Sequence, residues 1–277
     1  MVEFALSEEQ EMLRELAHEF ARDTVRPNAE HWDANSQFPT EAIAEAHALG
    51  LTNLHIPAEY GGMGMGILDE VLVSEEFSWG DPGFGTAAYS NGLTVGPVIT
   101  GGTEEQKAEY LGRLVKEPLI ASYCVTEPGA GSDVASIQTT AVRDGDHYIL
   151  NGQKMWITGA GQADWFFVLA YTDKSAGYKG MSAFIVESSW DGVSLGKKET
   201  NMGQRASDTR AVIFEDVHVP VENLIGGVEG AGWFNAMKAF DLSRPNVAAQ
   251  AVGCSRAAYE YALQYADERK TFGKKLH

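Results

Sequence analysis

The sequence predicts an α+β protein in which helices, a sheet and then helices again follow one another along the chain. Three observations support this prediction. Apolar residues recur at helical spacing up to about residue 118, β-branched and aromatic residues cluster in short runs over 119–228, and helical spacing returns over 229–277. Elements segregated in this way form separate layers, unlike alternating strands and helices. We therefore expect three domains, at 1–118, 119–228 and 229–277.

The first domain is predicted to be helical. Ser7 and Gln10 have the spacing of a capping box, and apolar residues then recur at helical spacing until Pro27 ends the pattern. Similar patterns predict helices over 41–49 and 67–77, and a second capping box begins at Thr103. Gly-rich loops are expected between these helices, at 61–66 and 80–85.

The middle domain is predicted to be a sheet. Its clearest element is a hairpin that joins 147–150 to 153–158 through Asn151-Gly152. Both residues tolerate the positive φ angles that a type I′ turn requires. Runs of β-branched and aromatic residues at 165–171, 181–187 and 211–215 predict further strands.

The third domain is predicted to begin as a pair of amphipathic helices from about Glu229. Its apolar side includes Val247, Val252, Tyr259 and Leu263, and no later segment of this sequence can cover it. Such a surface has to pack against earlier helices or another chain. We therefore expect these 277 residues to be part of a longer protein.

Composition excludes some classes of partner. The 277 residues include 21 Lys+Arg and 39 Asp+Glu, which gives a net charge of −18 at pH 7. Because binding to nucleic acid depends on basic residues that neutralise phosphates, nucleic acid is not an expected partner. The histidines show no metal-ligand spacing, so no metal site is expected.

The sequence also indicates a compartment. Cys124 and Cys254 lie far apart in a chain of this length, which argues against a disulfide framework and favours a reducing environment. The N-terminus, Met1-Val2-Glu3-Phe4 followed by polar residues, does not have the pattern of a leader. No apolar run reaches the length of a membrane span, so we expect a soluble intracellular protein.

Two segments could bind a cofactor. In 123–133 a short strand runs into a Gly-rich loop, whose backbone N–H groups and Ser132 hydroxyl could hold a phosphate. In 156–159 the Trp156 indole offers a flat face for a planar ring such as a flavin, and Thr158 offers a hydroxyl. The alternatives are an ordinary turn for the first segment and a core tryptophan for the second.

Two further segments place an arginine beside hydroxyl groups on predicted helices, at 241–245 and 267–273. The planar guanidinium suits phosphate recognition, although its more common fate is a solvated ion pair. In chain order, the segments 123–133, 151–158, 201–209 and 268–273 together resemble the acyl-CoA dehydrogenase family of flavoenzymes, especially its medium-chain and short-chain members. The resemblance extends over the whole chain.

This resemblance implies a fold and an oligomer. The family fold consists of an N-terminal helical domain, a middle β-barrel-like domain and a C-terminal helical bundle, of which 229–277 would be only the beginning. FAD is the implied cofactor, and the family resemblance implies a homo-oligomer, a tetramer at full length. The location would be the cytoplasm of a bacterium or archaeon, or the mitochondrial matrix of a eukaryote.

The resemblance also implies roles for individual residues. Those implied to bind FAD in the same chain are Tyr123, Val125, Thr126, Gly131, Ser132, Trp156, Ile157 and Thr158. Arg269, Thr271 and Phe272 would reach the adenosine-diphosphate half of FAD in a neighbouring subunit. Ser132, Asp241 and Arg244 would contact the acyl-CoA.

The implied reaction is α,β-dehydrogenation of a fatty acyl-CoA to the trans-2-enoyl-CoA, with electrons passed to an electron-transferring flavoprotein. A carboxylate removes the α-proton in this chemistry. In most of the family that carboxylate belongs to a glutamate that would lie beyond His277, and the position used in other branches is Ser243 here. We therefore expect no catalytic base within the chain, because Glu229, Asp241 and Glu260 match no known base position.

Two alternatives remain open from the sequence. A short paralogue could bind acyl-CoA or a protein partner without catalysis. An oxidase-like enzyme could instead pass electrons from the reduced flavin to oxygen.

Overall fold

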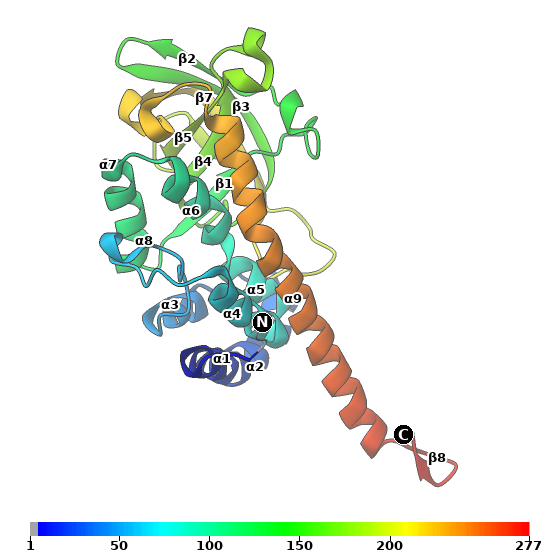
Figure 1. The fold of residues 1–277 in the computed structure, drawn as a ribbon. Coiled ribbons are helices and arrows are strands. Elements are labelled where there is room, and N and C mark those ends of the chain that lie inside the picture. Colours follow the sequence, from blue (N-terminus) through cyan, green and yellow to red (C-terminus); the bar gives the residue numbers. More distant parts are fainter. Residues whose placement is uncertain (1–4, 277) are drawn as a thin grey trace.

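The computed structural model describes residues 5–276 and has a helical part, a sheet and one long helix that runs past both (Figure 1). Met1–Phe4 and His277 lie outside the described residues, and so does the interpretation of the N-terminus as lacking a leader. The predicted α+β class is confirmed. Within the described range no helix is long and apolar enough to cross a bilayer.

The N-terminal helices begin at the predicted cap but continue further than predicted. The Ser7 hydroxyl accepts a hydrogen bond from the Gln10 amide (3.2 Å), and α1 (Glu8–Phe20) follows. A π-helical turn at Ala21–Val25 then leads directly into α2 (Arg26–Asn35). Pro27 therefore does not end the helical segment. It lies at the second position of α2, just after the π-helical turn.

Two helices occupy a segment where we expected loops or made no prediction. They are α5 (Pro82–Ala88) and α6 (Ser90–Gly101). In α5, a Cβ atom built on Gly85 would lie 2.2 Å from the Ser78 hydroxyl oxygen, so this glycine permits close packing against α4 (Ile67–Gly80). The remaining helices of the N-terminal part are α3 (Thr40–Ala48), α7 (Glu104–Gln106) and α8 (Gly112–Lys116).

The middle part is a seven-stranded sheet of half-barrel shape, in agreement with the predicted β domain. The strand order is β1-β4-β2-β3-β7-β6, and β5 pairs with β4. The strands are β1 (Ile120–Cys124), β2 (Thr140–Asp144), β3 (His147–Thr158), β4 (Ala163–Tyr171), β5 (Met181–Glu187), β6 (Val193–Leu195) and β7 (Thr209–Pro220).

The predicted turn at Asn151-Gly152 is wrong. Both residues lie within the continuous strand β3, and the hairpin instead connects β2 to β3 around Gly145 (φ 65°). Asn151-Gly152 forms a bulge against β7, where the Asn151 side chain bonds to Asp216 at 2.9 Å. Gly152 has φ 152°, and a Cβ there would lie 2.4 Å from the Thr139 hydroxyl oxygen. The Asn-Gly pair thus relieves crowding inside a strand.

The C-terminal part is one helix, α9 (Gly232–Glu268), and not the predicted pair. Its first half packs on β5, α6 and α4, and Arg256 then forms a salt bridge with Glu75 on α4 (2.5 Å). Beyond this point α9 projects away from the rest of the molecule and ends in a small hairpin of β8 (Lys270–Thr271) and β9 (Lys274–Lys275) (Figure 1). Its apolar side chains are exposed as predicted, including Val247, Val252, Tyr259 and Leu263.

Candidate functional site

A cavity of about 390 Å³ lies where the helical part, the sheet and α9 meet. This volume is within the usual range for a small-molecule site. The helical wall consists of Thr86, Tyr89, Ser90 and Leu93, the sheet wall of Tyr123, Thr126, Trp156, Ile157 and Thr158, and the third wall of Gln204 with Phe240, Val247 and Gln250 from α9. Five of the predicted cofactor residues therefore share one cavity, and all five belong to the sheet wall.

Trp156 is not a core residue. The pairing of β3 with β7 shifts register between Lys154 and Ile157, and Trp156 lies in this bulge with φ 62°. Its side chain is 56% exposed and lines the cavity. A positive φ is costly for a bulky residue and persists where the surroundings hold it, often at a functional site. The geometry therefore favours a flat binding surface at this position.

A buried ion pair lies behind Trp156. The Lys154 ammonium is fully buried and donates to the Glu127 carboxylate (2.8 Å), the Leu169 carbonyl (2.7 Å) and the Val125 carbonyl (3.2 Å). Glu127 also accepts hydrogen bonds from the Thr139 amide (3.0 Å) and the Thr139 hydroxyl (2.5 Å). These bonds link the strand that carries Trp156 to the segment that carries Val125.

A backbone hydrogen bond makes the same connection one residue further along, from the Met155 amide to the Thr126 carbonyl (2.9 Å). Hydrogen bonds from Lys154 and from Met155 therefore hold the segments of Trp156 and Thr126 in place relative to each other. Burial raises the pKa of the Glu127 carboxyl, but the Lys154 charge and the donated hydrogen bonds outweigh it and hold the pKa below its usual value. Burial lowers the pKa of Lys154, and Glu127 only partly offsets this effect.

The cavity wall has polar groups that suit a flavin ring. Within the part of the chain that the structure describes, the hydroxyl groups of Thr126 and Thr158 form no hydrogen bond with protein atoms. The Thr158 carbonyl, by contrast, accepts a hydrogen bond from Ser122 (2.7 Å) and holds its strand in place. A half-exposed indole and two available hydroxyl groups fit a planar ring that carries hydrogen-bond acceptors.

The Gly-rich loop after β1 suits a phosphate. Gly131 and Ser132 are exposed, a Cβ built on Gly131 would meet no atom within 4 Å, and among residues 5–276 no acceptor is recorded for either backbone N–H. Open amides on a Gly-rich loop can converge on an anion. Ser132 does not line the cavity, whereas Thr126, six residues earlier in the same segment, does.

Helix α9 carries the two predicted CoA contacts. Arg244 lies between Phe240 and Val247 at helical spacing, so it shares the face that closes the cavity. It forms an exposed salt bridge with Asp241 (2.6 Å). Ser243 is buried and donates to the Phe240 carbonyl (3.2 Å), so the position used by other branches of the family holds no acid here.

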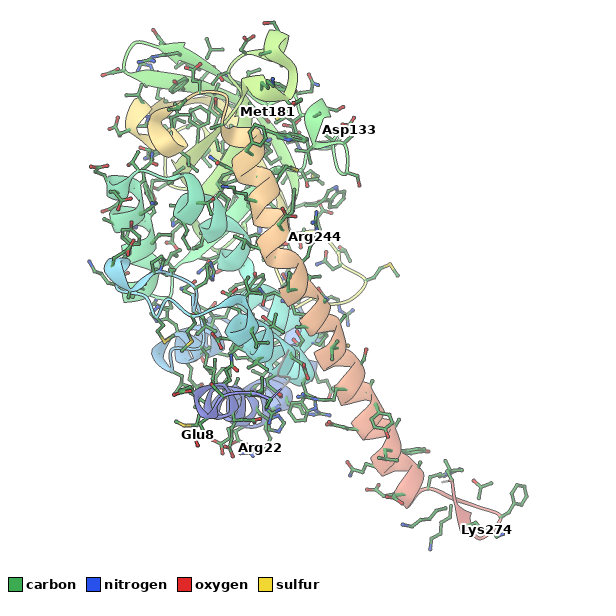
Figure 2. All side chains as sticks on the ribbon, in the orientation of Figure 1. Glu8, Arg22, Asp133, Met181, Arg244 and Lys274 are labelled. Atoms are coloured by element: carbon green, nitrogen blue, oxygen red, sulfur yellow. The ribbon has the colours of Figure 1, made fainter. Side chains whose placement is uncertain are left out.

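The structure does not bring Arg269, Thr271 and Phe272 to this cavity. They lie at the end of α9 and in the β8–β9 hairpin. Figure 2 shows Lys274 in that hairpin, far from Arg244 on α9 and from Asp133 in the Gly-rich loop. Phe272 is fully exposed.

The three acids considered from the sequence all have other partners. Glu229 accepts from the Tyr148 hydroxyl (2.6 Å), Asp241 pairs with Arg244, and Glu260 accepts from the Trp79 indole (2.7 Å). None of them lines the cavity, and the described lining includes no Asp or Glu at all.

Sequence reasoning missed some residues of the site. Tyr89 and Leu93 line the cavity but come from the junction and first turn of helices that the sequence did not predict. Lys154 and Glu127 lie inside the recognised motifs, yet nothing in their spacing indicated a buried pair. A lysine in the middle of a strand was the one available signal, since buried lysines are rare unless paired.

Comparisons with known proteins match all three parts of the chain. Sequence models of three parts of one family match: acyl-CoA dehydrogenase N-terminal domain at residues 7–118, middle domain at 122–217 and C-terminal domain at 230–277. The probable medium-chain specific acyl-CoA dehydrogenase 2, mitochondrial, of Caenorhabditis briggsae is 48% identical over 276 residues, which are 99% of this chain and 67% of that protein.

Solved structures agree. A chain in the structure of the electron transferring flavoprotein of Acidaminococcus fermentans superposes with a TM-score of 0.96 at 41% identity, covering 99% of this chain and 72% of that one. The acyl-CoA dehydrogenase complexed with FAD from Bacillus anthracis gives a TM-score of 0.90 at 35% identity, covering 100% of this chain and 48% of that one.

Proposed function

Because the chain belongs to the acyl-CoA dehydrogenase family of FAD-dependent oxidoreductases, we propose that it acts in the α,β-dehydrogenation of a fatty acyl-CoA to the trans-2-enoyl-CoA. We propose an electron-transferring flavoprotein as the electron acceptor. The observation that carries the proposal is the sheet wall of the cavity, which gathers Tyr123, Thr126, Trp156 and Thr158 around one space. Bound FAD would supply the two-electron acceptor for the substrate's β-hydrogen.

The chain's own residues would bind and orient the cofactor. Trp156 would pack against the flavin ring, and Thr126 and Thr158 would donate hydrogen bonds to it. Val125, just after β1, and Ile157, on β3, would also contact the ring. The support is that both hydroxyl groups are available while the backbone behind them is held by Lys154 and Met155. Gly131 and Ser132 would hold the pyrophosphate with their open amides.

The CoA part of the substrate would lie along α9. Arg244 lies on α9 between the lining residues Phe240 and Val247 and is exposed, so its guanidinium can approach a phosphate without being desolvated first. Asp241 would keep the guanidinium oriented until the ligand arrives, and Ser132 would contact the same ligand from the opposite side.

A base is missing from the cavity lining described above. We propose that a carboxylate outside residues 1–277 removes the α-proton, and that this chain alone is inactive. Arg269, Thr271 and Phe272 would contact the adenosine-diphosphate half of FAD held by a neighbouring subunit of a homotetramer. Their full separation from the chain's own cavity supports this role.

Titration of the chain with FAD tests the site. Trp156→Leu should weaken binding about fivefold, because it removes an aromatic surface whose stacking contributes about 1 kcal/mol beyond area burial. Trp190→Leu, just before β6 and outside the cavity lining, is the matched control and should leave the affinity unchanged. Equal affinities for all three proteins would exclude the Trp156 surface as the flavin site.

Anaerobic mixing of the FAD-loaded chain with octanoyl-CoA tests the missing base. The visible absorbance of the flavin should remain unbleached. Bleaching would show that a base exists within these residues and would overturn this part of the proposal.

The absence of an acid from the described lining also favours a second candidate, a non-catalytic protein that binds acyl-CoA. The encoding gene separates the two candidates. A reading frame that continues in phase beyond His277 and encodes a glutamate-bearing helical segment supports the enzyme, whereas a stop codon there supports the binder.

A further inference from the structure

A buried polar cluster lies behind the helical wall of the cavity. The Glu70 carboxylate is hydrogen-bonded to the His55 ring on one oxygen and accepts from the Asn246 amide (3.2 Å) on the other. The same Asn246 amide donates to the Tyr89 hydroxyl oxygen (2.7 Å), and the Asn246 carbonyl accepts from Ser74 (3.1 Å). Glu70, Ser74 and Asn246 are all buried. The cluster therefore ends at Tyr89, which lines the cavity.

The hydrogen bonds of this cluster leave one donor available. Asn246 uses both amide hydrogens, one on Glu70 and one on Tyr89, so the Tyr89 oxygen acts as an acceptor. Burial, with a contribution from the Glu70 charge, raises the pKa of Tyr89 despite the hydrogen bond from Asn246, so its hydroxyl stays protonated. Among residues 5–276 no acceptor is recorded for that hydrogen.

The other hydroxyl groups of the helical wall are already used. Thr86 donates to the Gln204 side chain (3.0 Å), and Ser90 donates to the Ala121 carbonyl (3.3 Å). On the sheet wall, Tyr123 donates to the Ala236 carbonyl (2.9 Å). Tyr89 is thus the tyrosine of this cavity whose hydrogen is available to a ligand.

The surroundings of Tyr89 restrict the kind of acceptor. Behind its ring lies a second, small cavity of about 30 Å³, which has room for one water and is also lined by Glu70 and Asn91. A Glu70 carboxylate so close by disfavours a second anion. A neutral oxygen, by contrast, can take the hydrogen without bringing a like charge into the interior.

Resting on the proposed function, we propose that Tyr89 forms a polar subsite for the far end of the acyl chain. It would select short acyl-CoA thioesters that carry an uncharged hydrogen-bond acceptor, such as a hydroxyl or keto oxygen, at that end. The sheet wall holds the flavin in the proposed function, so an acyl group placed against it extends toward the opposite, helical wall, where Tyr89 lies.

Calorimetric titration of the FAD-saturated chain tests this subsite. The probes are pentanoyl-CoA and 4-hydroxybutyryl-CoA, whose acyl groups have the same number of non-hydrogen atoms but end in a methyl and a hydroxyl. Tyr89→Phe should weaken binding of the hydroxy ester by about threefold to tenfold and leave the pentanoyl ester within about twofold, as the loss of one neutral hydrogen bond implies.

Tyr123→Phe is the matched control, because its hydroxyl group lies in the same cavity but is used on Ala236. It should change the affinity for both esters by the same factor. Tyr89→Met, which also lacks the hydroxyl but packs differently, should reproduce the change in ratio seen with Tyr89→Phe and so separates the loss of the donor from a disturbance of packing.

The outcomes are distinguishable. If pentanoyl-CoA binds and the ratio of the two affinities is unchanged in both Tyr89 variants, the polar subsite is excluded while the proposed function stands. If neither ester binds to the wild-type chain, both the subsite and the acyl-CoA site in this cavity are excluded. A larger loss for pentanoyl-CoA than for the hydroxy ester would assign Tyr89 a packing role and overturn the proposal.

Discussion

Two buried carboxylates, Glu127 and Glu70, lie behind opposite walls of the same cavity and are held in different ways. Glu127 is paired with the fully buried Lys154 ammonium and accepts several further hydrogen bonds, so its cluster is closed. Glu70 is held by an imidazole and an amide, and its cluster ends at a tyrosine with a hydrogen available. The closed cluster fixes the shape of the wall that we assign to the cofactor, and the open one leaves a contact for the substrate.

The largest predicted effect follows from breaking the closed cluster. Lys154→Met removes the cation but leaves Glu127 buried, and an unpaired buried charge destabilises a protein by about 3–5 kcal/mol. Urea denaturation at pH 7 measures this loss. Lys198→Met is the control, since that lysine is only partly buried and donates to the Ser36 and Arg205 carbonyl groups. A loss no larger than that of the control would contradict the description of Glu127 as a charged, closed cluster.

Replacing both partners separates stability from cofactor binding. In Lys154→Met with Glu127→Leu no unpaired charge remains, so most of the lost stability should return. The bonds from Lys154 to Val125 and Leu169 are still absent, and we therefore expect FAD to bind several-fold more weakly than to the wild type. Parallel urea and FAD titrations measure the two quantities. Recovery of both would show that the pair does not position the Trp156 surface.

Breaking the open cluster around Glu70 should lower the free energy of unfolding less than Lys154→Met does. Asn246→Leu leaves one Glu70 oxygen, Ser74 and Tyr89 without a partner, and each unsatisfied buried group costs about 1–3 kcal/mol before water or side-chain movement compensates. The neighbouring small cavity can admit water, so we expect a total near the lower end of that range. Asn28→Leu, which removes an exposed hydrogen bond to Thr24, should change the urea midpoint very little. An Asn246 effect larger than that of Lys154→Met would reverse the comparison.

The sequence predicted the order of the domains better than the conformation at the site. Helical and strand periods are local properties, so the α+β class and strands such as Trp165–Tyr171 could be inferred directly. Asn151-Gly152 was assigned to a turn because local preference favours one, but pairing of β3 with β7 on both sides keeps it inside a strand. The helix α5 was missed because its glycines are typical of a loop, and the close packing of Gly85 against Ser78 is not visible in the sequence.

Much of the site could not be predicted from the sequence either, because it depends on contacts between residues that are far apart along the chain. The sequence indicated that Trp156 could face a ring, but its exposure depends on a bulge set by the partner strand. The contacts of Tyr89 depend on Asn246, which is 157 residues away along the chain. The pairing of Glu70 with His55 also needs the packed helices, since neither residue belongs to a recognisable motif.

Acid should reduce the stability that the closed cluster around Glu127 contributes. Because the pKa of Glu127 lies below its ordinary value of 4.5 in the folded protein, this group contributes stability above that ordinary pKa. The contribution is lost as the pH falls through the lower, folded pKa. The urea midpoint of the wild type should therefore fall more between pH 6 and pH 3 than that of the Lys154→Met, Glu127→Leu double variant. Parallel curves for the two proteins would contradict the assignment.

The smallest predicted effect on stability concerns a charged pair that is mostly exposed. Asp241 and Arg244 are exposed on α9 one turn apart, and such pairs contribute at most about 0.5 kcal/mol. Arg244→Gln should therefore leave the urea midpoint almost unchanged. The same variant should weaken binding of CoA thioesters severalfold, with a smaller effect at high salt, because its charge is available to a phosphate. The Lys154 charge pairs with Glu127 and stabilises the fold. The Arg244 charge, by contrast, would bind a phosphate of the ligand. Equal affinity of the wild type and Arg244→Gln at low salt would remove this residue from the proposed CoA site.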